Sequence, residues 1–353
     1  MHIGIPREVK TLEGRVGLIP AAAAELVAQG HQLLVEQGAG VLSGYSDEEY
    51  RQAGASLIAD AATLYGEAQM IIKVKEPQPQ ELPLLRADHL LFCYLHLAAE
   101  QRLMQKLLEI GLTAVAFETV AEGRALPLLA PMSDIAGKVA VQVGSHLLHQ
   151  PQGGRGLLLG GLPAAERGQV VVLGAGVAGG SAAAMAAAIG AQVTVFDHNR
   201  DKLAAMRALG ANVTALQPYA HDIERAVLGA DLLIGAVLIP GASAPHLVSA
   251  EQVKQMQPGS VIIDISVDQG GCIETTRPTT YAEPTFVQHG VIHFGVTNMP
   301  GAVPRTASQA LSAALIPYAL KLATGDWQAN PALMAGINVR AGEVVYPALK
   351  GRD

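Results

Sequence analysis

The chain has 353 residues, more than one hydrophobic core usually supports, so two domains are expected. Half of the residues are hydrophobic, 16% are charged and 4% are aromatic, which is typical of a closely packed α/β protein. A formal net charge of -7 argues against a nucleic-acid-binding surface, because such surfaces cluster lysine and arginine.

The cysteine content and the first residues indicate a cytoplasmic protein. Cys93 and Cys272 are too few for a disulfide framework and lie in apolar or glycine-rich sequence. Charged side chains between residues 7 and 10 interrupt the apolar core that a signal peptide needs. Residues 169–196 carry no charge and could cross a bilayer by length, but their five glycines favour strand, turn, helix and strand. No membrane partner and no metal site are predicted.

Apolar runs alternate with helix-like segments in the first third of the chain. Such alternation predicts parallel βα units whose strand C-terminal ends form one functional edge. The predicted strands are residues 2–6, 31–37, 70–77, 88–97 and 112–118, and the predicted helices are residues 21–29 and 101–111.

A second α/β series follows a helix-compatible segment at residues 133–149 and a glycine-rich loop. Its predicted strands are residues 169–173, 192–197, 231–236 and 260–265. Residues 308–324 are predicted to form a helix that bends at Pro317 and returns to the first domain.

The predicted fold class is therefore α/β, with two Rossmann-like domains and a cleft between them. A discontinuous substrate domain takes residues 1–130 and 305–353, and an inserted dinucleotide-binding domain takes residues 131–304.

The segment VVVLGAGVAG follows a predicted strand and opens an alanine-rich helix. In such a motif Gly174 permits the tight turn, Gly176 lets the backbone approach a pyrophosphate, and Gly179 allows close helix packing. The helix N-terminus adds N–H groups and a favourable dipole for an anion. A glycine spacing alone is weak evidence in a chain with 38 glycines, so the strand and helix around it decide the prediction.

Asp197 lies at the end of the next predicted strand, where a carboxylate can accept hydrogen bonds from both ribose hydroxyls. This favours NAD over NADP, whose 2′-phosphate the carboxylate would repel, although Arg200 keeps NADP open. The remaining alternative is a structural glycine turn beside a solvated aspartate.

Three polar residues of the first domain fall where its strands should end. Arg15 and Lys75 could each be a solvated surface charge, and His96 could be a hydrogen-bonded core histidine. Beside a nicotinamide domain they suit a small 2-oxo acid, because two cations bind its oxygens and an imidazole moves a proton near neutral pH.

In VIIDISVDQGGC, two aspartates have different predicted roles. Asp264 lies within the strand and is expected to be structural. Asp268 falls at the carboxyl edge of the sheet, where it could face a substrate or serve as an ordinary turn residue.

An ordered set of motifs spans nearly the whole chain and resembles the alanine dehydrogenase and transhydrogenase alpha-subunit family. The motifs are IGIPREVK, RVGLIP, KVKEP, LHLAAE, APMSDIAGK, GGRGLLLGG, GAGVAG, GAVLIPGASAPHLV, DISVDQGGC, RPTTY and NMPGAVPRTAS. The resemblance implies an NAD-dependent enzyme of amino-acid metabolism that interconverts L-alanine with pyruvate and ammonia, assembled as a homohexamer.

The resemblance also implies roles for individual residues. Arg15 and Lys75 would bind substrate, with His96 and Asp268 catalytic. The cofactor contacts would come from Ser133, Gly174, Gly176, Val177, Gly179, Asp197, Lys202, Val237, Leu238, Ile265, Ser266, Val267, Asp268, Arg277, Val296, Thr297, Asn298 and Met299.

The chain departs from the family pattern at Gly14 and Gly17, where Asn and Ala are usual, and at Pro218, where a cofactor-contacting Ser is often found. Two related activities remain as alternatives: hydride exchange between nucleotides, as in a transhydrogenase, and a reductase of the lysine pathway. A non-catalytic dinucleotide-binding protein is a further alternative.

Overall fold

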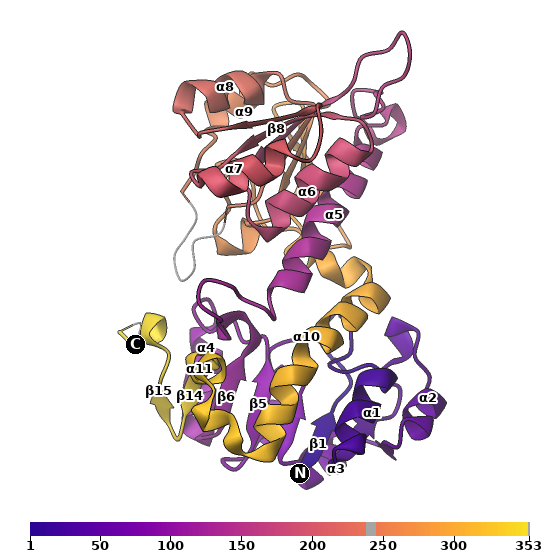
Figure 1. Cartoon of the computed structure of the whole chain (residues 1–353), viewed down its shortest axis with the longest axis vertical. Helices are drawn as coiled ribbons and strands as arrows, with labels where there is room; N and C mark the ends of the chain where they lie inside the picture. The colour runs from indigo at the N-terminus through magenta and orange to yellow at the C-terminus, as the bar shows by residue number, and fades with distance from the viewer. Residues whose placement is uncertain (238–244, 352–353) are drawn as a thin grey trace. The chain divides into compact units, whose positions relative to one another are not determined.

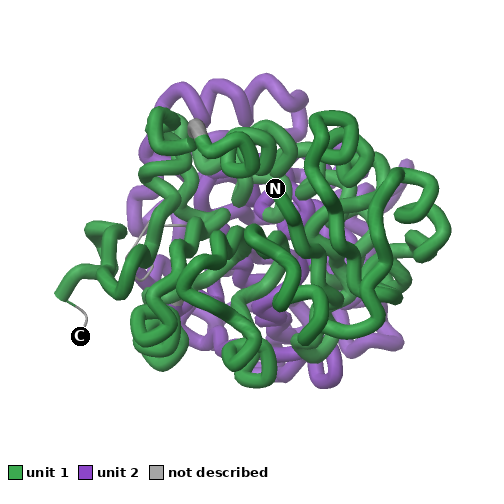
Figure 2. The backbone as a smooth tube through the Cα atoms, turned by 90° about the horizontal axis from the view of Figure 1, so that it is seen from below, with its two compact units in different colours: residues 1–132, 301–353 green, residues 133–300 purple. Residues whose placement is uncertain are grey.

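The computed structural model describes residues 1–237 and 245–351. The chain forms two compact units, one of residues 1–132 with 301–353 and the other of residues 133–300 (Figure 2). Each unit contains a largely parallel sheet with helices around it (Figure 1), which confirms the predicted α/β class with two Rossmann-like domains.

The sheet of the first unit, as far as the chain is described, has eight strands in the order β15-β14-β6-β5-β4-β1-β2-β3. The strands β1 to β6 are parallel, whereas β14 and β15 add antiparallel pairs at one edge. Their bounds are β1 (His2–Ile5), β2 (Gln32–Glu36), β3 (Ser56–Ile58), β4 (Met70–Ile72), β5 (Leu90–Cys93), β6 (Thr113–Ala116), β14 (Ile337–Arg340) and β15 (Glu343–Val344). The strand order reverses between β1 and β4, where doubly wound sheets bind ligands.

Local sequence explains where the helices of this unit begin and end. Proline occupies the first turn of α1 and α10, a position where its missing N–H costs nothing. Ser46 and Glu49 form a capping box at α2, and Gly111 ends α4 with a φ of 79°. The helices are α1 (Pro20–Ala28), α2 (Asp47–Gln52), α3 (Ala61–Glu67), α4 (Gln101–Ile110), α10 (Pro304–Thr324) and α11 (Pro331–Gly336).

The described residues of the second unit form a seven-stranded sheet in the order β12-β13-β11-β10-β7-β8-β9. All neighbouring pairs are parallel except β12 with β13. The strands are β7 (Gln169–Leu173), β8 (Gln192–Phe196), β9 (Val213–Leu216), β10 (Leu232–Gly235), β11 (Val261–Asp264), β12 (Thr285–Gln288) and β13 (Val291–Phe294). Here the order reverses between β7 and β10.

Small residues let the helices of this unit approach their neighbours closely. A Cβ on Gly137 would lie 2.1 Å from the backbone oxygen of Ala178, so α5 and α6 meet at a point that only glycine permits. Gly137 therefore allows the backbones of α5 and α6 to come into contact. The helices are α5 (Ala130–Leu147), α6 (Val177–Ala188), α7 (Arg200–Arg207), α8 (Ala220–Leu228) and α9 (Ala250–Lys254).

Three predicted strands of the first unit are shorter than expected, and this difference has a physical cause. The strands β4, β5 and β6 end at Ile72, Cys93 and Ala116. Apolar residues such as Val74 and Leu95 continue beyond the strand ends and are buried in the loops. The hydrophobic pattern therefore ran past the ends of the strands. Helix α10 starts earlier than predicted and continues through Pro317.

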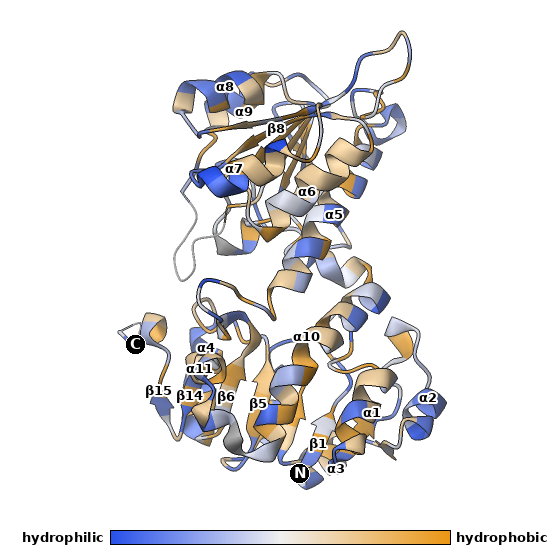
Figure 3. Ribbon diagram, in the orientation of Figure 1, coloured by the Kyte–Doolittle hydropathy of each residue, from blue (hydrophilic) through white to orange (hydrophobic). Residues whose placement is uncertain are grey.

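Apolar side chains fill both units, and the strands are mainly hydrophobic in Figure 3 while α7 is mainly hydrophilic. In the first unit Ile71, Leu91 and Ala114 belong to one cluster with Leu103 and Leu107 of α4. Within the described part of the chain, no helix is both long and apolar enough to cross a membrane.

A lysine is completely buried beneath the edge of the first sheet. Lys73 Nζ lies 3.3 Å from Glu8 Oε2 and 3.1 Å from Glu81 Oε2, and its side chain is 0% exposed. Burial lowers its pKa, but the two carboxylates outweigh burial and raise it above the ordinary value. Tyr65 donates a further hydrogen bond of 2.9 Å to Glu81. The lysine therefore stays charged and neutralises part of this acidic cluster.

Replacing Lys73 with Met should lower the free energy of unfolding by about 3–5 kcal/mol, because Glu8 and Glu81 would remain buried without their counter-ion. Urea titration measures the loss. Lys106→Met is the control, since Lys106 is exposed and pairs with the exposed Glu109, and its effect should stay within about 0.5 kcal/mol. Equal midpoints for the two variants would contradict the stabilising role of Lys73.

Candidate functional site

Three of the predicted functional residues follow neighbouring parallel strands at one edge of the first sheet. Arg15 follows β1, Lys75 follows β4 and His96 follows β5. Because β1 pairs with β4 and β4 with β5, their C-terminal ends are adjacent. This edge includes the point of strand-order reversal, so the topology brings the three loops together.

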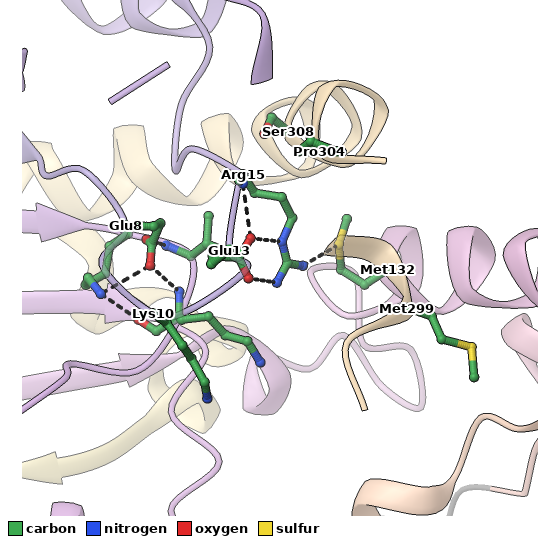
Figure 4. A network of polar contacts seen from close by, with 12 residues as sticks. Glu8, Lys10, Glu13, Arg15, Met132, Met299, Pro304 and Ser308 are labelled. Atoms are coloured by element: carbon green, nitrogen blue, oxygen red, sulfur yellow. Dashed lines mark hydrogen bonds and ion pairs between the residues drawn. The ribbon is translucent and has the colours of Figure 1, made fainter. Parts of the chain in front are cut away.

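Arg15 is held in a buried ion pair. Its Nε and Nη2 atoms donate to Glu13 Oε1 and Oε2 at 2.7 and 2.6 Å, and its side chain is only 3% exposed (Figure 4). Burial lowers the pKa of the guanidinium, but Glu13 outweighs that effect and raises it. The third nitrogen, Nη1, lies 3.2 Å from the sulfur of Met132. Arg15 is therefore a permanently charged group in a fixed orientation.

The backbone around Arg15 is equally fixed. Val16 donates its N–H to Ser308 Oγ of α10 at 3.0 Å. A Cβ on Gly17 would lie 2.8 Å from the backbone oxygen of Ile72, so the loop touches the end of β4. Gly17, one of the two glycines that depart from the family pattern, therefore permits a close backbone contact.

Lys75 is half-buried among charged groups. Its N–H donates to Glu8 Oε2 at 3.3 Å, and the preceding N–H of Val74 donates to Glu8 Oε1 at 2.6 Å. Burial lowers the pKa of the ammonium, with repulsion from Arg15 and Lys10 adding to this and attraction to nearby carboxylates opposing it. Lys75 thus loses its proton more readily than an exposed lysine.

His96 has an unusual backbone conformation. Its φ is 51°, in the left-handed region that residues with a Cβ rarely adopt. Its N–H donates to Glu118 Oε1 at 2.6 Å, and its ring is stacked on Tyr94 with centroids 5.9 Å apart. Both contacts come from the ends of β5 and β6. The half-buried imidazole is therefore positioned by the hydrogen bond of its backbone N–H to Glu118 and by the stacking of one ring face on Tyr94.

Each of these three residues donates its own backbone N–H to a glutamate, and sequence reasoning identified none of the glutamates. Arg15 N donates to Glu13 at 3.1 Å, while Lys75 and His96 bind Glu8 and Glu118 as described. Glu8 and Glu13 lie close to Arg15 in sequence, but no spacing pattern marks them. Such an edge can bind a small carboxylate through two cations and exchange a proton through His96.

The glycine turn of the second unit joins β7 to α6. Gly174 has a φ of 97°, and a Cβ on Gly179 would lie 1.8 Å from the Gly174 oxygen. A Cβ on Gly176 would meet nothing within 4 Å. The backbone conformation therefore requires glycine at residue 174, and the close backbone contact requires glycine at residue 179. The space beside Gly176 is open.

Asp197 follows β8 and contacts the same turn. Its carboxylate accepts hydrogen bonds of 2.8 Å from the N–H groups of Ala175 and Asn199. Lys202 Nζ lies 3.7 Å from Asp197 Oδ2, so these two predicted cofactor residues are neighbours. Arg277, another predicted cofactor residue, lies apart from Asp197 and Lys202. Its guanidinium stacks over Phe286 of β12, and β12 is at the opposite edge of the sheet from β8 and β9.

The remaining predicted cofactor residues lie mainly beyond other strands of this sheet. Val237 follows β10, and Ser133 lies in α5. Ile265, Ser266, Val267 and Asp268 follow β11, and Val296, Thr297, Asn298 and Met299 follow β13. Val177 begins α6. Leu238 lies outside the described residues.

The two aspartates near β11 have different surroundings. Asp264 is buried and accepts hydrogen bonds from Ser266 N, Cys272 N and Thr276 Oγ1 at 3.0, 2.8 and 3.0 Å. Burial raises its pKa although these bonds act in the opposite direction. Asp268 is exposed in the short helix Val267–Gln269. Asp264 therefore ties the loop together, and Asp268 is the one accessible to a ligand.

Comparisons with known proteins agree across both units. The family described as "Alanine dehydrogenase/PNT, N-terminal domain" matches residues 4–136, and "Alanine dehydrogenase/PNT, C-terminal domain" matches residues 140–347. The alanine dehydrogenase of Bacillus subtilis strain 168 is 50% identical over 99% of this chain and 94% of its own length. That of Mycobacterium tuberculosis H37Rv is 47% identical over 98% of this chain and 95% of its own length.

Two solved structures resemble the whole chain. An L-alanine dehydrogenase has a TM-score of 0.95 at 50% identity, with 99% of this chain and 98% of that chain covered. A transhydrogenase from Sinorhizobium meliloti has a TM-score of 0.86 at 27% identity, with 99% of this chain and 100% of that chain covered.

A matched pair of glycine substitutions separates folding of the turn from ligand binding. Gly179→Ala should lower the free energy of unfolding by about 2–3 kcal/mol, because its Cβ collides with backbone. Gly176→Ala should leave stability nearly unchanged but weaken binding of NADH, measured by its fluorescence, because the methyl group occupies the open side of the turn. Unchanged NADH affinity in Gly176→Ala would contradict a pyrophosphate site here.

Proposed function

Because this chain belongs to the alanine dehydrogenase/PNT family and is an oxidoreductase, we propose that it catalyses the reversible, NAD-dependent oxidative deamination of L-alanine to pyruvate and ammonia. The observation that carries the proposal is the placement of Arg15, Lys75 and His96 after three adjacent strands, each anchored by a glutamate. The high identity to alanine dehydrogenases over almost the full chain supports alanine as substrate.

Arg15 and Lys75 would bind the substrate carboxylate and carbonyl oxygen. Glu13 engages two of the guanidinium nitrogens, while Nη1 is directed at the Met132 sulfur. A thioether is a weak hydrogen-bond acceptor, so a substrate carboxylate would displace this contact favourably. The strong pair with Glu13 would meanwhile keep the guanidinium in place.

His96 would move the protons of the reaction. After loss of hydride from the alanine Cα, water adds to the resulting imine and the adduct collapses to pyruvate and ammonia. Each of these steps transfers a proton to or from a nitrogen or oxygen, which suits an imidazole near neutral pH. Asp268 would assist at the reacting carbon.

The second unit fits a dinucleotide such as NAD, which would supply the hydride acceptor. The open space at Gly176 and the N-terminus of α6 suit a pyrophosphate, and Asp197 suits the ribose hydroxyls. Ser133, Val237 and the loops after β11 and β13 would hold the nicotinamide end. We further propose that the enzyme is a cytoplasmic homohexamer.

Hydride exchange between two nucleotides is the main competing function, given the similarity to a transhydrogenase. Such exchange needs no acid or base toward a substrate. The fixed orientation of His96 and the higher identity to alanine dehydrogenases favour deamination.

A direct assay tests the proposal. Purified protein with NAD should form NADH with L-alanine, more slowly with other amino acids, and more slowly still with NADP in place of NAD, because Asp197 repels the 2′-phosphate. Absorbance at the reduced-nicotinamide band follows the reaction. No product with L-alanine, together with hydride exchange between NADH and a second nucleotide, would replace this proposal with a transhydrogenase.

His96→Ala should lower kcat for alanine oxidation by about 10²- to 10⁴-fold, because the proton transfers lose their acid and base. His221→Ala is the control, since His221 is exposed on α8 in the other unit, and its kcat should match that of the parent protein. Near-normal turnover by His96→Ala would refute the proton role.

A further inference from the structure

We propose that Glu118 is a positioning residue that holds His96 in the conformation needed for proton transfer. The inference rests on the role proposed above for His96. Glu118 acts on the histidine backbone, because its carboxylate accepts hydrogen bonds from the N–H groups of Leu95 and His96.

The register of the sheet brings the two residues together. Strands β5 and β6 are parallel, with Cys93 paired to Ala116 at their last residues. Two residues beyond these ends lie Leu95 and Glu118, the latter in the short helix Phe117–Thr119. The Leu95 N–H is 3.2 and 3.3 Å from the two oxygens of Glu118, and the His96 N–H is 2.6 Å from Oε1.

Two successive N–H groups that point at one anion form a concave binding site for it. In this chain the anion is the Glu118 carboxylate, and the conformation it stabilises includes the left-handed φ of 51° at His96. That conformation is unfavourable for a residue with a Cβ unless its surroundings enforce it. Without the carboxylate, two N–H groups lose their acceptor and His96 is free to relax toward ordinary backbone angles.

The imidazole ring is positioned by a separate contact. Tyr94 stacks on it with an interplanar angle of 11°, and Tyr94 is fixed by a 2.6 Å hydrogen bond from its hydroxyl to the Leu128 oxygen. Phe117, next to Glu118, packs edge-on against the Tyr94 ring at 5.0 Å. If the backbone of His96 relaxes, its ring leaves this stack. Glu118 therefore controls the direction in which the imidazole nitrogens point.

Glu118→Ala tests this role. Its kcat for L-alanine should fall by about 10- to 100-fold, because small displacements of a catalytic group have effects of this size. KM should change by less than about threefold, because Arg15 and Lys75 are anchored by Glu13 and Glu8. The conservative variant Glu118→Gln keeps one oxygen acceptor and should recover part of the lost kcat. If Glu118→Ala does not fold, the kcat and KM of Glu118→Gln are compared with those of the parent protein instead.

Glu122→Gln is the matched control. Glu122 lies in the same connecting segment but accepts its hydrogen bond from Tyr318 of α10 at 2.7 Å. The kcat of this variant should equal that of the parent. A loss as large as that of Glu118→Gln would show that any change in this segment impairs turnover, and would overturn the proposal.

A double-mutant cycle distinguishes positioning from general damage. In a His96→Ala background, Glu118→Ala should cause no further loss of kcat, because residues that act as a unit are non-additive. Multiplicative losses would overturn the proposal. If the parent protein oxidises alanine but Glu118→Ala turns over at the same rate, only this inference fails. If the parent does not oxidise alanine, the proposed function itself fails.

Discussion

Hydrogen bonds from backbone N–H groups to glutamate carboxylates hold the loops on which the candidate site depends. The N–H groups of Arg15, Lys75 and His96 lie beyond the ends of β1, β4 and β5, and they donate to side-chain carboxylates. Glu13, Glu8 and Glu118 supply them and at the same time place negative charge beside a site rich in cations. The same bonds therefore satisfy the backbone and orient the groups that would meet substrate.

Glu8 also links this edge to the buried charge cluster beneath it. One carboxylate accepts the N–H groups of Val74 and Lys75 and forms an ion pair with Lys73. Ions buried in a protein are tolerated only when several partners compensate the lost hydration, and this cluster provides them. Stability of the first unit and the placement of Lys75 thus depend on the same carboxylate.

Much of the architecture could be predicted from the sequence because hydrophobic periodicity and glycine placement report on local structure. The strand at residues 169–173, the glycine turn and the two α/β series all follow from such patterns. Short elements such as β3, β14 and β15 could not, because so few residues show no period. The strand ends near Lys75 and His96 were also missed, since buried Val74 and Leu95 extend the apolar runs into the loops.

Among the candidate site residues, those that follow strands were identifiable, because the C-terminal edge of a parallel sheet is where ligands gather. Glu118 was not, since its role arises from the register of β5 with β6, which no single-sequence pattern encodes. The stacking of Arg277 on Phe286 of β12 is likewise a contact that no single-sequence pattern encodes.

The pairing of β14 with β6 has a consequence for the order in which the chain can fold. Ile337 pairs with Val115, so the sheet of the first unit gains its edge strands only after residues 337–344 have left the ribosome. The strands of the second unit are contiguous in sequence and have all emerged by Phe294. During synthesis the inserted unit can therefore complete its sheet first, while the edge of β6 waits unpaired for the C-terminal segment.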